Sequence, residues 1–149
     1  MTIKIVLADS HPIIRQGLAL LLAGEPDMRV VGEAADCGTT IKLIQAFSPQ
    51  VVIMDISMPD LNGVEATRRI LSQYPRIKII ALSMHSDILF VLNMLNAGAS
   101  SYLLKDCALE ELVRAIRTVV TQKIYLSPNL SNLLVTDLAN KFSLDDPGD

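Results

Sequence analysis

The sequence predicts an α/β domain in which a five-stranded, doubly wound parallel sheet is covered by helices on both faces. The chain has 149 residues, which is the size of one ordinary domain. Hydrophobic residues make up 50% of it but aromatic residues only 4%, so the core must be built from aliphatic side chains. Apolar runs of strand length alternate with stretches of helical period, and this alternation is typical of right-handed βαβ units.

Five apolar runs are expected to form the strands of the sheet. They are rich in Val, Ile and Leu, as strands are when they lie between two layers of helices. Charged residues make up 19% of the chain, below the ~25% of typical domains, which fits a sheet covered on both sides. The expected strands are 3–8, 30–34, 51–54, 77–82 and 101–104.

A helix is expected after each strand, because apolar residues then recur at every third or fourth position. Pro12 suits the first turn of the first helix, and Asn62 with Gly63 opens the third. Ala97 and Gly98 close the fourth, where glycine is favoured as a C-cap. The expected helices are 12–22, 41–47, 64–71, 88–95 and 109–120.

A further apolar stripe follows the fifth helix and predicts a linker helix with an acidic tail in residues 126–149. This stripe is expected to pack either against the domain itself or against a second chain. Residues 1–125 are expected to form the main domain, with 12 Lys+Arg against 12 Asp+Glu, and the rest carries a net charge of −3. Neither part is basic, so DNA binding by this chain alone is not expected. The stripe consists of Leu130, Leu134, Leu138 and Phe142.

The two cysteines, Cys37 and Cys107, form neither a disulfide framework nor part of a Cys/His cluster, which favours a reducing, cytoplasmic location. Cys107 lies close to the start of an expected helix, where a thiol pKa is expected to fall. The apolar runs are far shorter than the ~18 residues that a membrane span requires. We therefore expect no membrane partner.

Polar residues stand at the ends of four expected strands, namely Asp9, Asp55, Ser83 and Lys105. The carboxyl ends of parallel strands meet at one edge of the sheet, where such folds bind ligands. The Asp55 carboxylate can accept a phosphoryl group, and Asp9 can share a Mg²⁺ ion with it. Lys105 and Ser83 can contact the phosphoryl oxygens. Each residue alone is more simply a cap, a turn residue or a solvated side chain, but together they favour a phosphoryl-accepting site.

These residues lie in longer segments that carry a resemblance to a known family. The segments are VLADSHP (6–12), VIMDISMP (52–59), LNG (61–63), ALSMH (81–85) and GASSYLLKD (98–106). Over about residues 3–125 the chain resembles the receiver domain of bacterial two-component response regulators, within the NarL/FixJ (LuxR-type) subfamily. The resemblance implies a flavodoxin-like (βα)5 receiver fold, with a signalling role and not a metabolic enzyme.

The resemblance also implies roles for individual residues. Asp55 would be phosphorylated by a sensor histidine kinase, with Asp9 and the Ser57 backbone carbonyl as Mg²⁺ ligands. The other implied site residues are Ser83 and Lys105, as phosphoryl contacts, and Tyr102, as a switch aromatic whose rotamer follows Ser83. A second copy of the chain is an implied partner. DNA is implied only through a LuxR-type DNA-binding domain outside this chain, with control of transcription as the output.

Ser10 departs from the family pattern, which has a second acid at this position as a direct Mg²⁺ ligand. A neutral hydroxyl is a weaker ligand, so we expect weak Mg²⁺ binding and slow phosphorylation. Two alternatives stay open. Ser10 caps the helix that begins at Pro12, or the chain is a phosphorylation-independent receiver that acts as an interaction or dimerisation module. His11 and His85 are expected to be loop residues rather than metal ligands.

Overall fold

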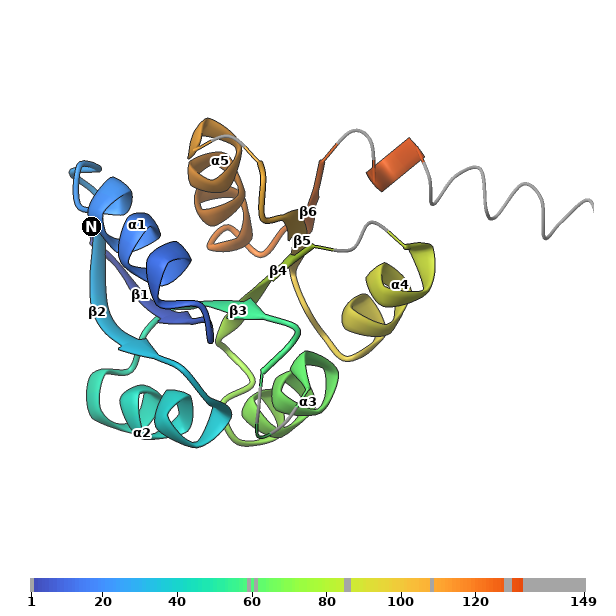
Figure 1. Cartoon of the computed structure of the whole chain (residues 1–149), viewed down its shortest axis with the longest axis horizontal. Helices are drawn as coiled ribbons and strands as arrows, with labels where there is room; N and C mark the ends of the chain where they lie inside the picture. Colours follow the sequence, from blue (N-terminus) through green and yellow to red (C-terminus); the bar gives the residue numbers. More distant parts are fainter. Residues whose placement is uncertain are drawn as a thin grey trace, which may run out of the picture.

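The computed structural model describes residues 2–58, 60, 62–84, 87–107, 109–127 and 130–132 of the chain. Its centre is a six-stranded parallel sheet with the strand order β2-β1-β3-β4-β5-β6 (Figure 1). The strands are β1 (Ile3–Ala8), β2 (Met28–Ala34), β3 (Val51–Asp55), β4 (Lys78–Ser83), β5 (Ser101–Leu104) and β6 (Tyr125–Leu126). The helices are α1 (Pro12–Leu22), α2 (Cys37–Phe47), α3 (Gly63–Gln73), α4 (Ile88–Asn96) and α5 (Leu109–Val119).

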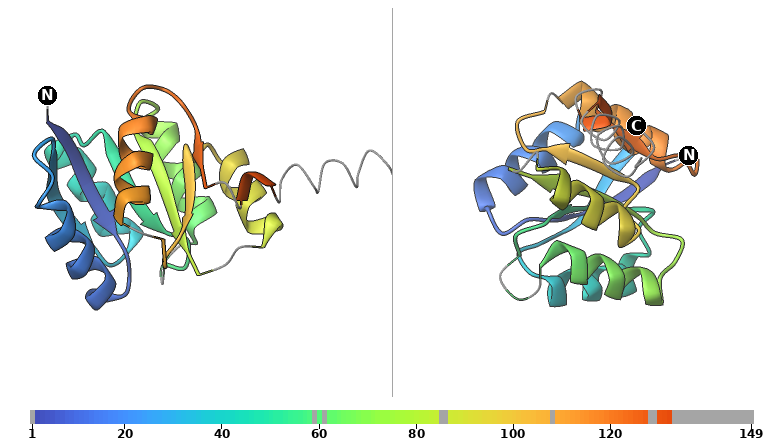
Figure 2. Two further views of the ribbon diagram at one scale, coloured as in Figure 1. Left: turned by 90° about the horizontal axis from the view of Figure 1, so that it is seen from above. Right: turned by 90° about the vertical axis from the view of Figure 1, so that its right-hand side faces the viewer.

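Helices cover both faces of the sheet, and each face has its own apolar layer (Figures 1 and 2). Leu22 of α1 and Ile116 of α5 are buried on one face. Ile44 of α2, Ile70 of α3 and Met94 of α4 are buried on the other. The core is mostly aliphatic, as the composition predicts. In β1, β3, β4 and β5, burial on both faces leaves the polar residues at or near the ends of the strands.

The structure confirms the α/β class, the doubly wound parallel arrangement and all five expected strands. It adds β6, a strand of two residues that pairs with β5, with a hydrogen bond of 2.9 Å from Tyr125 N to Ser100 O. So short a strand leaves no periodic pattern in a sequence. The second helix begins at Cys37 instead of residue 41, because the Asp36 side chain accepts a hydrogen bond from Thr39 N and caps it.

The chain after β6 returns to the apolar layer that contains α4. Leu130 is buried there, and its amide donates a hydrogen bond to Ser127 Oγ at 3.4 Å. The other residues of the expected stripe, Leu134, Leu138 and Phe142, lie outside the described residues, as does the acidic end of the tail. None of the described helices combines the length and the apolar character needed to cross a membrane.

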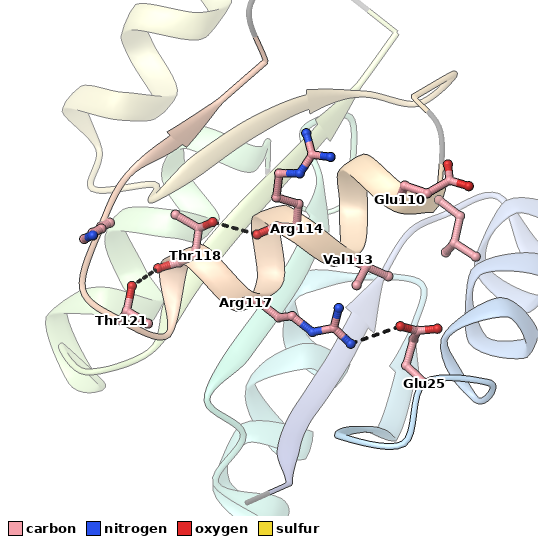
Figure 3. A pocket seen from close by; sticks show the side chains of 9 residues that line it. Glu25, Glu110, Val113, Arg114, Arg117, Thr118 and Thr121 are labelled. Atoms are coloured by element: carbon pink, nitrogen blue, oxygen red, sulfur yellow. Dashed lines mark hydrogen bonds and ion pairs between the residues drawn. The ribbon is translucent and has the colours of Figure 1, made fainter.

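Arg117 fastens α5 to the turn between α1 and β2 (Figure 3). Its guanidinium lies 2.9 Å from an oxygen of Asp27 and 3.1 Å from one of Glu25. The hydrogen bond from Arg117 lowers the pKa of the Asp27 carboxyl, and the same bond raises the pKa of the Arg117 guanidinium. Glu25 and Arg117 line a pocket on α5 that does not include the polar residues at the strand ends.

Gly63→Ala is expected to destabilise the protein, because the first residue of α3 lies directly against the loop after β3. A Cβ atom at this position would lie 2.5 Å from the Cα of Ile56. The Gly63 amide also donates a hydrogen bond of 2.8 Å to the Ile56 carbonyl, which holds the two backbones together. We expect the free energy of unfolding, measured by urea denaturation, to fall by about 1–3 kcal/mol.

Gly17→Ala, in the middle of α1, is the matched control. A Cβ atom there meets no other atom within 4 Å, so the substitution should raise the free energy of unfolding by about 0.5–1 kcal/mol through better helix propensity. A Gly63→Ala protein as stable as wild type would contradict the close approach of α3 to the loop.

Candidate functional site

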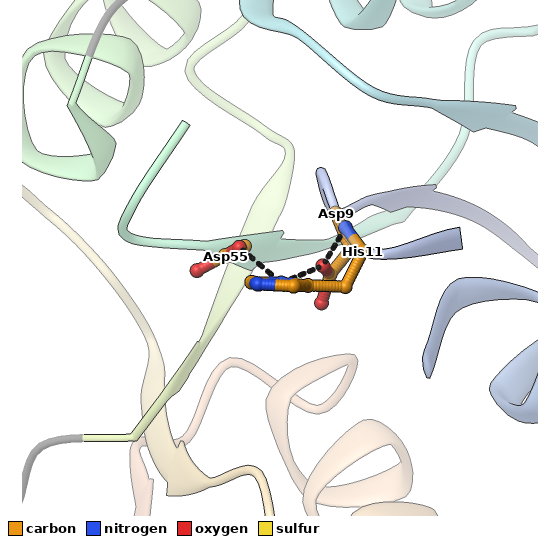
Figure 4. A group of neighbouring side chains, drawn as sticks. All are labelled: Asp9, His11 and Asp55. Atoms are coloured by element: carbon orange, nitrogen blue, oxygen red, sulfur yellow. Dashed lines mark hydrogen bonds and ion pairs between the residues drawn. The ribbon is translucent and has the colours of Figure 1, made fainter. Parts of the chain in front are cut away.

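Four side chains meet at the carboxyl edge of the sheet. Asp9 follows β1, Asp55 ends β3 and Lys105 follows β5, while His11 lies just before α1. Figure 4 shows Asp9, His11 and Asp55 pointing toward one another. β1 has β2 on one side and β3 on the other, so the group lies at the point where the direction of winding reverses. Ligands of open α/β sheets bind at such a point.

Lys105 joins the two carboxylates. Its Nζ atom lies 3.1 Å from Oδ2 of Asp9 and 3.1 Å from Oδ2 of Asp55. All three side chains are at most 4% exposed, so one positive charge is buried with two negative charges. Buried charges are tolerated only when they are paired and hydrogen-bonded. The group therefore has one negative charge in excess and is suited to a further cation.

Backbone amides orient both carboxylates. Asp9 Oδ1 accepts a hydrogen bond of 2.8 Å from the amide of His11, and Asp55 Oδ1 accepts one of 2.9 Å from the amide of Ser57. Asp9 Oδ2 accepts no hydrogen bond within the described residues, although the Lys105 ammonium is close to it. An oriented carboxylate pair with a buried oxygen free of hydrogen bonds fits a divalent cation such as Mg²⁺, which prefers oxygen ligands.

Ser10 does not cap the first helix, so that alternative is wrong. The cap residue of α1 is His11, and it makes no side-chain capping bond. The Ser10 hydroxyl instead donates to Asp55 Oδ2 over a long distance of 3.4 Å. The reason is local: α1 begins at Pro12 as expected, so the capping position is the residue directly before it, His11, and Ser10 lies one residue too early.

His11 is part of the group, which the sequence did not predict. Its Nδ1 atom lies 3.1 Å from Asp9 Oδ1, 3.1 Å from Lys105 Nζ and 3.6 Å from Asp55 Oδ2. The side chain is 57% exposed, so the ring covers the buried charges from the solvent side. The available signal was its position two residues after Asp9, at a strand end. His85 lies outside the described residues.

Ser83 and Tyr102 lie beside the charged group on β4 and β5. Both are buried, with exposed fractions of 1% and 0%. Burial raises the pKa of the Tyr102 hydroxyl, and a side-chain hydrogen bond with Ser83 opposes that rise. The Ser83 carbonyl also accepts a hydrogen bond of 2.8 Å from the amide of Lys105. A movement of Ser83 would therefore shift both the Lys105 backbone and the Tyr102 side chain, because each is hydrogen-bonded to Ser83.

Asp60 is a second residue that the sequence did not single out. Its carboxylate accepts hydrogen bonds from the amides of Cys37 and Gly38, at 2.9 and 3.2 Å. These are the first two residues of α2, where backbone amides lack partners within the helix. The contact fastens the loop that carries Ser57 to the neighbouring helix. It therefore helps to fix the backbone beside Asp55.

The sequence-based prediction of a lowered thiol pKa at Cys107 is wrong. Burial raises the pKa of this thiol to about 11, and the negative charges of Glu111 and Asp106 add to the rise. Burial and these two negative charges outweigh any favourable effect of the nearby helix start. Cys107 is therefore a protonated, weakly reactive thiol at neutral pH.

Comparison with known proteins gives consistent matches. The family model for the response regulator receiver domain matches residues 5–117. DegU, a transcriptional regulatory protein of Brevibacillus brevis, is 38% identical over 135 residues, which are 91% of this chain and 57% of DegU. NreC, an oxygen regulatory protein of Staphylococcus haemolyticus, is 38% identical over 144 residues, which are 96% of this chain and 66% of NreC. This chain therefore spans less than two thirds of DegU.

A solved structure supports the same match in three dimensions. The crystal structure of a LuxR-family two-component response regulator from Aurantimonas sp. SI85-9A1 superposes with a TM-score of 0.88 at 34% sequence identity. The superposition covers 93% of this chain and 99% of that one. The likeness therefore includes nearly the whole of both chains.

Alkylation of Cys107 by iodoacetamide is expected to be slow at neutral pH and to accelerate as the pH approaches about 11, because only the thiolate reacts. Mass spectrometry of the Cys107 peptide over a pH series measures the rate. The same protein unfolded in urea is the control, and its rate should level off above the ordinary thiol pKa of about 8.5. A folded-state rate that levels off at that pH would contradict the raised pKa.

Proposed function

This chain belongs to the response regulator receiver domain family, among LuxR-family two-component response regulators, and we propose that it works as a phosphorylation-controlled switch. In this role Asp55 accepts a phosphoryl group from a sensor histidine kinase, and the chain does not act as a metabolic enzyme. One observation carries the proposal. A buried carboxylate, that of Asp55, lies 3.1 Å from a buried ammonium group, that of Lys105, at the ligand-binding edge of the sheet.

Asp55 has the surroundings that a phosphoryl acceptor needs. The Ser57 amide holds Oδ1, and the Lys105 ammonium lies beside Oδ2. In the transfer, a carboxylate oxygen forms a bond to phosphorus while the bond from phosphorus to the donor breaks, which leaves an acyl phosphate. Lys105 then lies where its charge can offset that of the phosphoryl oxygens.

Asp9, Asp55 and the Ser57 carbonyl are the groups that would hold Mg²⁺, with the Ser10 hydroxyl as a weaker fourth ligand. When bound, the ion would neutralise charge on the phosphoryl oxygens. The negative charge in excess at Asp9 and Asp55 supports this assignment, because a cation offsets the cost of burying it.

Ser83 is the residue that would respond to the phosphoryl group. Its hydroxyl is engaged with Tyr102. A phosphoryl group on Asp55 offers a charged acceptor, and hydrogen bonds to charged acceptors are roughly twice as strong as neutral ones. Ser83 would therefore turn toward Asp55, and the Tyr102 ring would repack. A local charge change of this kind biases two arrangements of the surrounding face.

β6 would carry the repacking of Tyr102 from the sheet to the chain that follows the domain. Tyr102 of β5 stands opposite Leu126 of β6, and Leu126 and Leu130 contact the same apolar layer as Tyr102.

In this proposal residues 1–125 form the receiver, and residues 126–149 form a linker toward a LuxR-type DNA-binding domain. A second copy of the chain, and DNA through that domain, would be the partners. The two unpaired cysteines support a cytoplasmic setting.

A second candidate function follows from Ser10. A hydroxyl stands where the family has an acid, and it lies 3.4 Å from Asp55 Oδ2. In this alternative the chain is a phosphorylation-independent module for interaction or dimerisation. The presence of Asp55, Ser83 and Lys105 together favours the switch, because an interaction module has no chemical use for that group.

Incubation with acetyl phosphate and Mg²⁺, followed by intact-protein mass spectrometry, tests the switch. We expect the mass to rise by one phosphoryl group, only when Mg²⁺ is present and not in Asp55→Asn. Ser10→Asp should be phosphorylated faster, because it restores a charged ligand. Hydrogen exchange at the Tyr125 amide, which donates a hydrogen bond to the Ser100 carbonyl directly before β5, should change in the phosphorylated protein and stay constant in Asp55→Asn.

The two candidate functions give different results in this experiment. No mass gain in wild type, together with a gain in Ser10→Asp, would replace the switch with the interaction module. No gain in either protein would contradict the assignment of Asp55 as a phosphoryl acceptor.

A further inference from the structure

Two adjoining recesses lie at the amino edge of the sheet, opposite the edge that carries Asp55. Their volumes are about 380 and 340 Å³, within the range of small-molecule pockets, and Arg76 lines both of them. Ile3 and Lys78 line the smaller recess and are the first residues of β1 and β4, which places it where these strands begin. The recesses therefore share no residue with the charged group around Asp55, which lies where the strands end.

The larger recess, which we call the apolar recess, lies beside the C-terminal ends of α2 and α3. Among the described residues that line it, Arg76 alone carries a charge. Most of the others are aliphatic, aromatic or proline residues, namely Ile44, Pro49, Tyr74, Pro75 and Ile77. Burial of apolar surface away from water is favourable, so this recess suits the uncharged body of a small molecule.

The smaller recess, which we call the cationic recess, lies between the start of β4 and the end of α5. Arg76 and Lys78 line it, and none of its described lining residues is acidic. Neither side chain forms an ion pair with the described residues. Lys78 Nζ donates a hydrogen bond of 2.5 Å to Gln122 Oε1, and an ammonium group has two further donors. Two positive charges without counter-charges repel each other, so an anion bound between them is favoured.

A carboxylate fits the two recesses better than a phosphate group does. The planar guanidinium of Arg76 can form two parallel hydrogen bonds to a carboxylate, and Lys78 adds a compact positive charge. Arg76 also borders the apolar recess, where a phosphate dianion with its bound water would be costly to place. A carboxylate carries a single charge, and an aliphatic chain attached to it can extend directly into the apolar recess.

We propose that the two recesses together form a binding site for a small aliphatic carboxylate. The carboxylate lies between Arg76 and Lys78 in the cationic recess, and the aliphatic chain lies against Ile44 and Tyr74 in the apolar recess. The site is separate from the group around Asp55, and its occupancy does not require phosphorylation.

Amide NMR titration of the full chain with hexanoate tests the proposal. We expect hexanoate to shift the amide resonances of Ile44, Arg76 and Lys78 and to leave that of Asp55 in place. Hexanoate should bind at least about fourfold more tightly than butanoate, because two more methylene groups are buried. 1-Hexanol, which keeps the chain but lacks the carboxylate, should bind at least about fivefold more weakly than hexanoate.

A matched pair of variants tests the role of the cationic recess. Arg76→Gln should lower the hexanoate affinity at least about fivefold, because it removes a charged hydrogen-bond donor. Arg29→Gln is the control, because it removes an exposed positive charge from β2 outside both recesses. It should leave the hexanoate affinity within about twofold of wild type.

Three outcomes would overturn the proposal. Equal affinities for hexanoate and butanoate would show that only an anion is held, without burial of the chain. Equal losses in Arg76→Gln and Arg29→Gln would show a general effect of charge. Shifts that leave Ile44, Arg76 and Lys78 in place would put the ligand elsewhere. The comparison of ligands uses the wild-type protein, so it decides the question even if a variant folds poorly.

Discussion

The ion pairs of Lys105 are the interaction on which the site depends. Two carboxylates buried side by side repel each other and lose their hydration, which is costly unless a counter-charge lies between them. The Lys105 ammonium, 3.1 Å from Oδ2 of Asp9 and of Asp55, supplies that counter-charge. It balances only one of the two negative charges. The remaining imbalance suits the group to a further cation.

The fold provides this arrangement through strand order and through two loop contacts. Parallel strands bring their carboxyl ends to one edge, so residues far apart in the sequence become neighbours there. Asp60 fastens the loop after β3 to α2, and the close approach of Gly63 to Ile56 fastens the same loop to α3. The backbone beside Asp55 is thus held from two directions. The Asp55 carboxylate is oriented before any ligand arrives.

The sequence predicts the strands and the residues at their ends, because both follow from local pattern. Asp9, Asp55, Ser83 and Lys105 each stand where an apolar run ends, and the structure brings all four to the same edge. The role of His11 was missed although it lies two residues after Asp9, because no local pattern shows that its ring turns toward Lys105, 94 positions away in the chain. Asp60 has the same difficulty, since its hydrogen bond reaches back 23 positions to Cys37. The rise in the pKa of Cys107 comes from burial, which no local pattern reveals.

A double-mutant cycle in a metal-free buffer tests the central role of Lys105 most directly. The measurement is the free energy of unfolding of wild type, Lys105→Met, Asp55→Asn and the double variant. Our account predicts that Lys105→Met costs about 3–5 kcal/mol in wild type, because it leaves buried carboxylates without a counter-charge. In the Asp55→Asn background the cost should be smaller by at least about 1 kcal/mol. Equal costs in both backgrounds, within about 0.5 kcal/mol, would contradict the account.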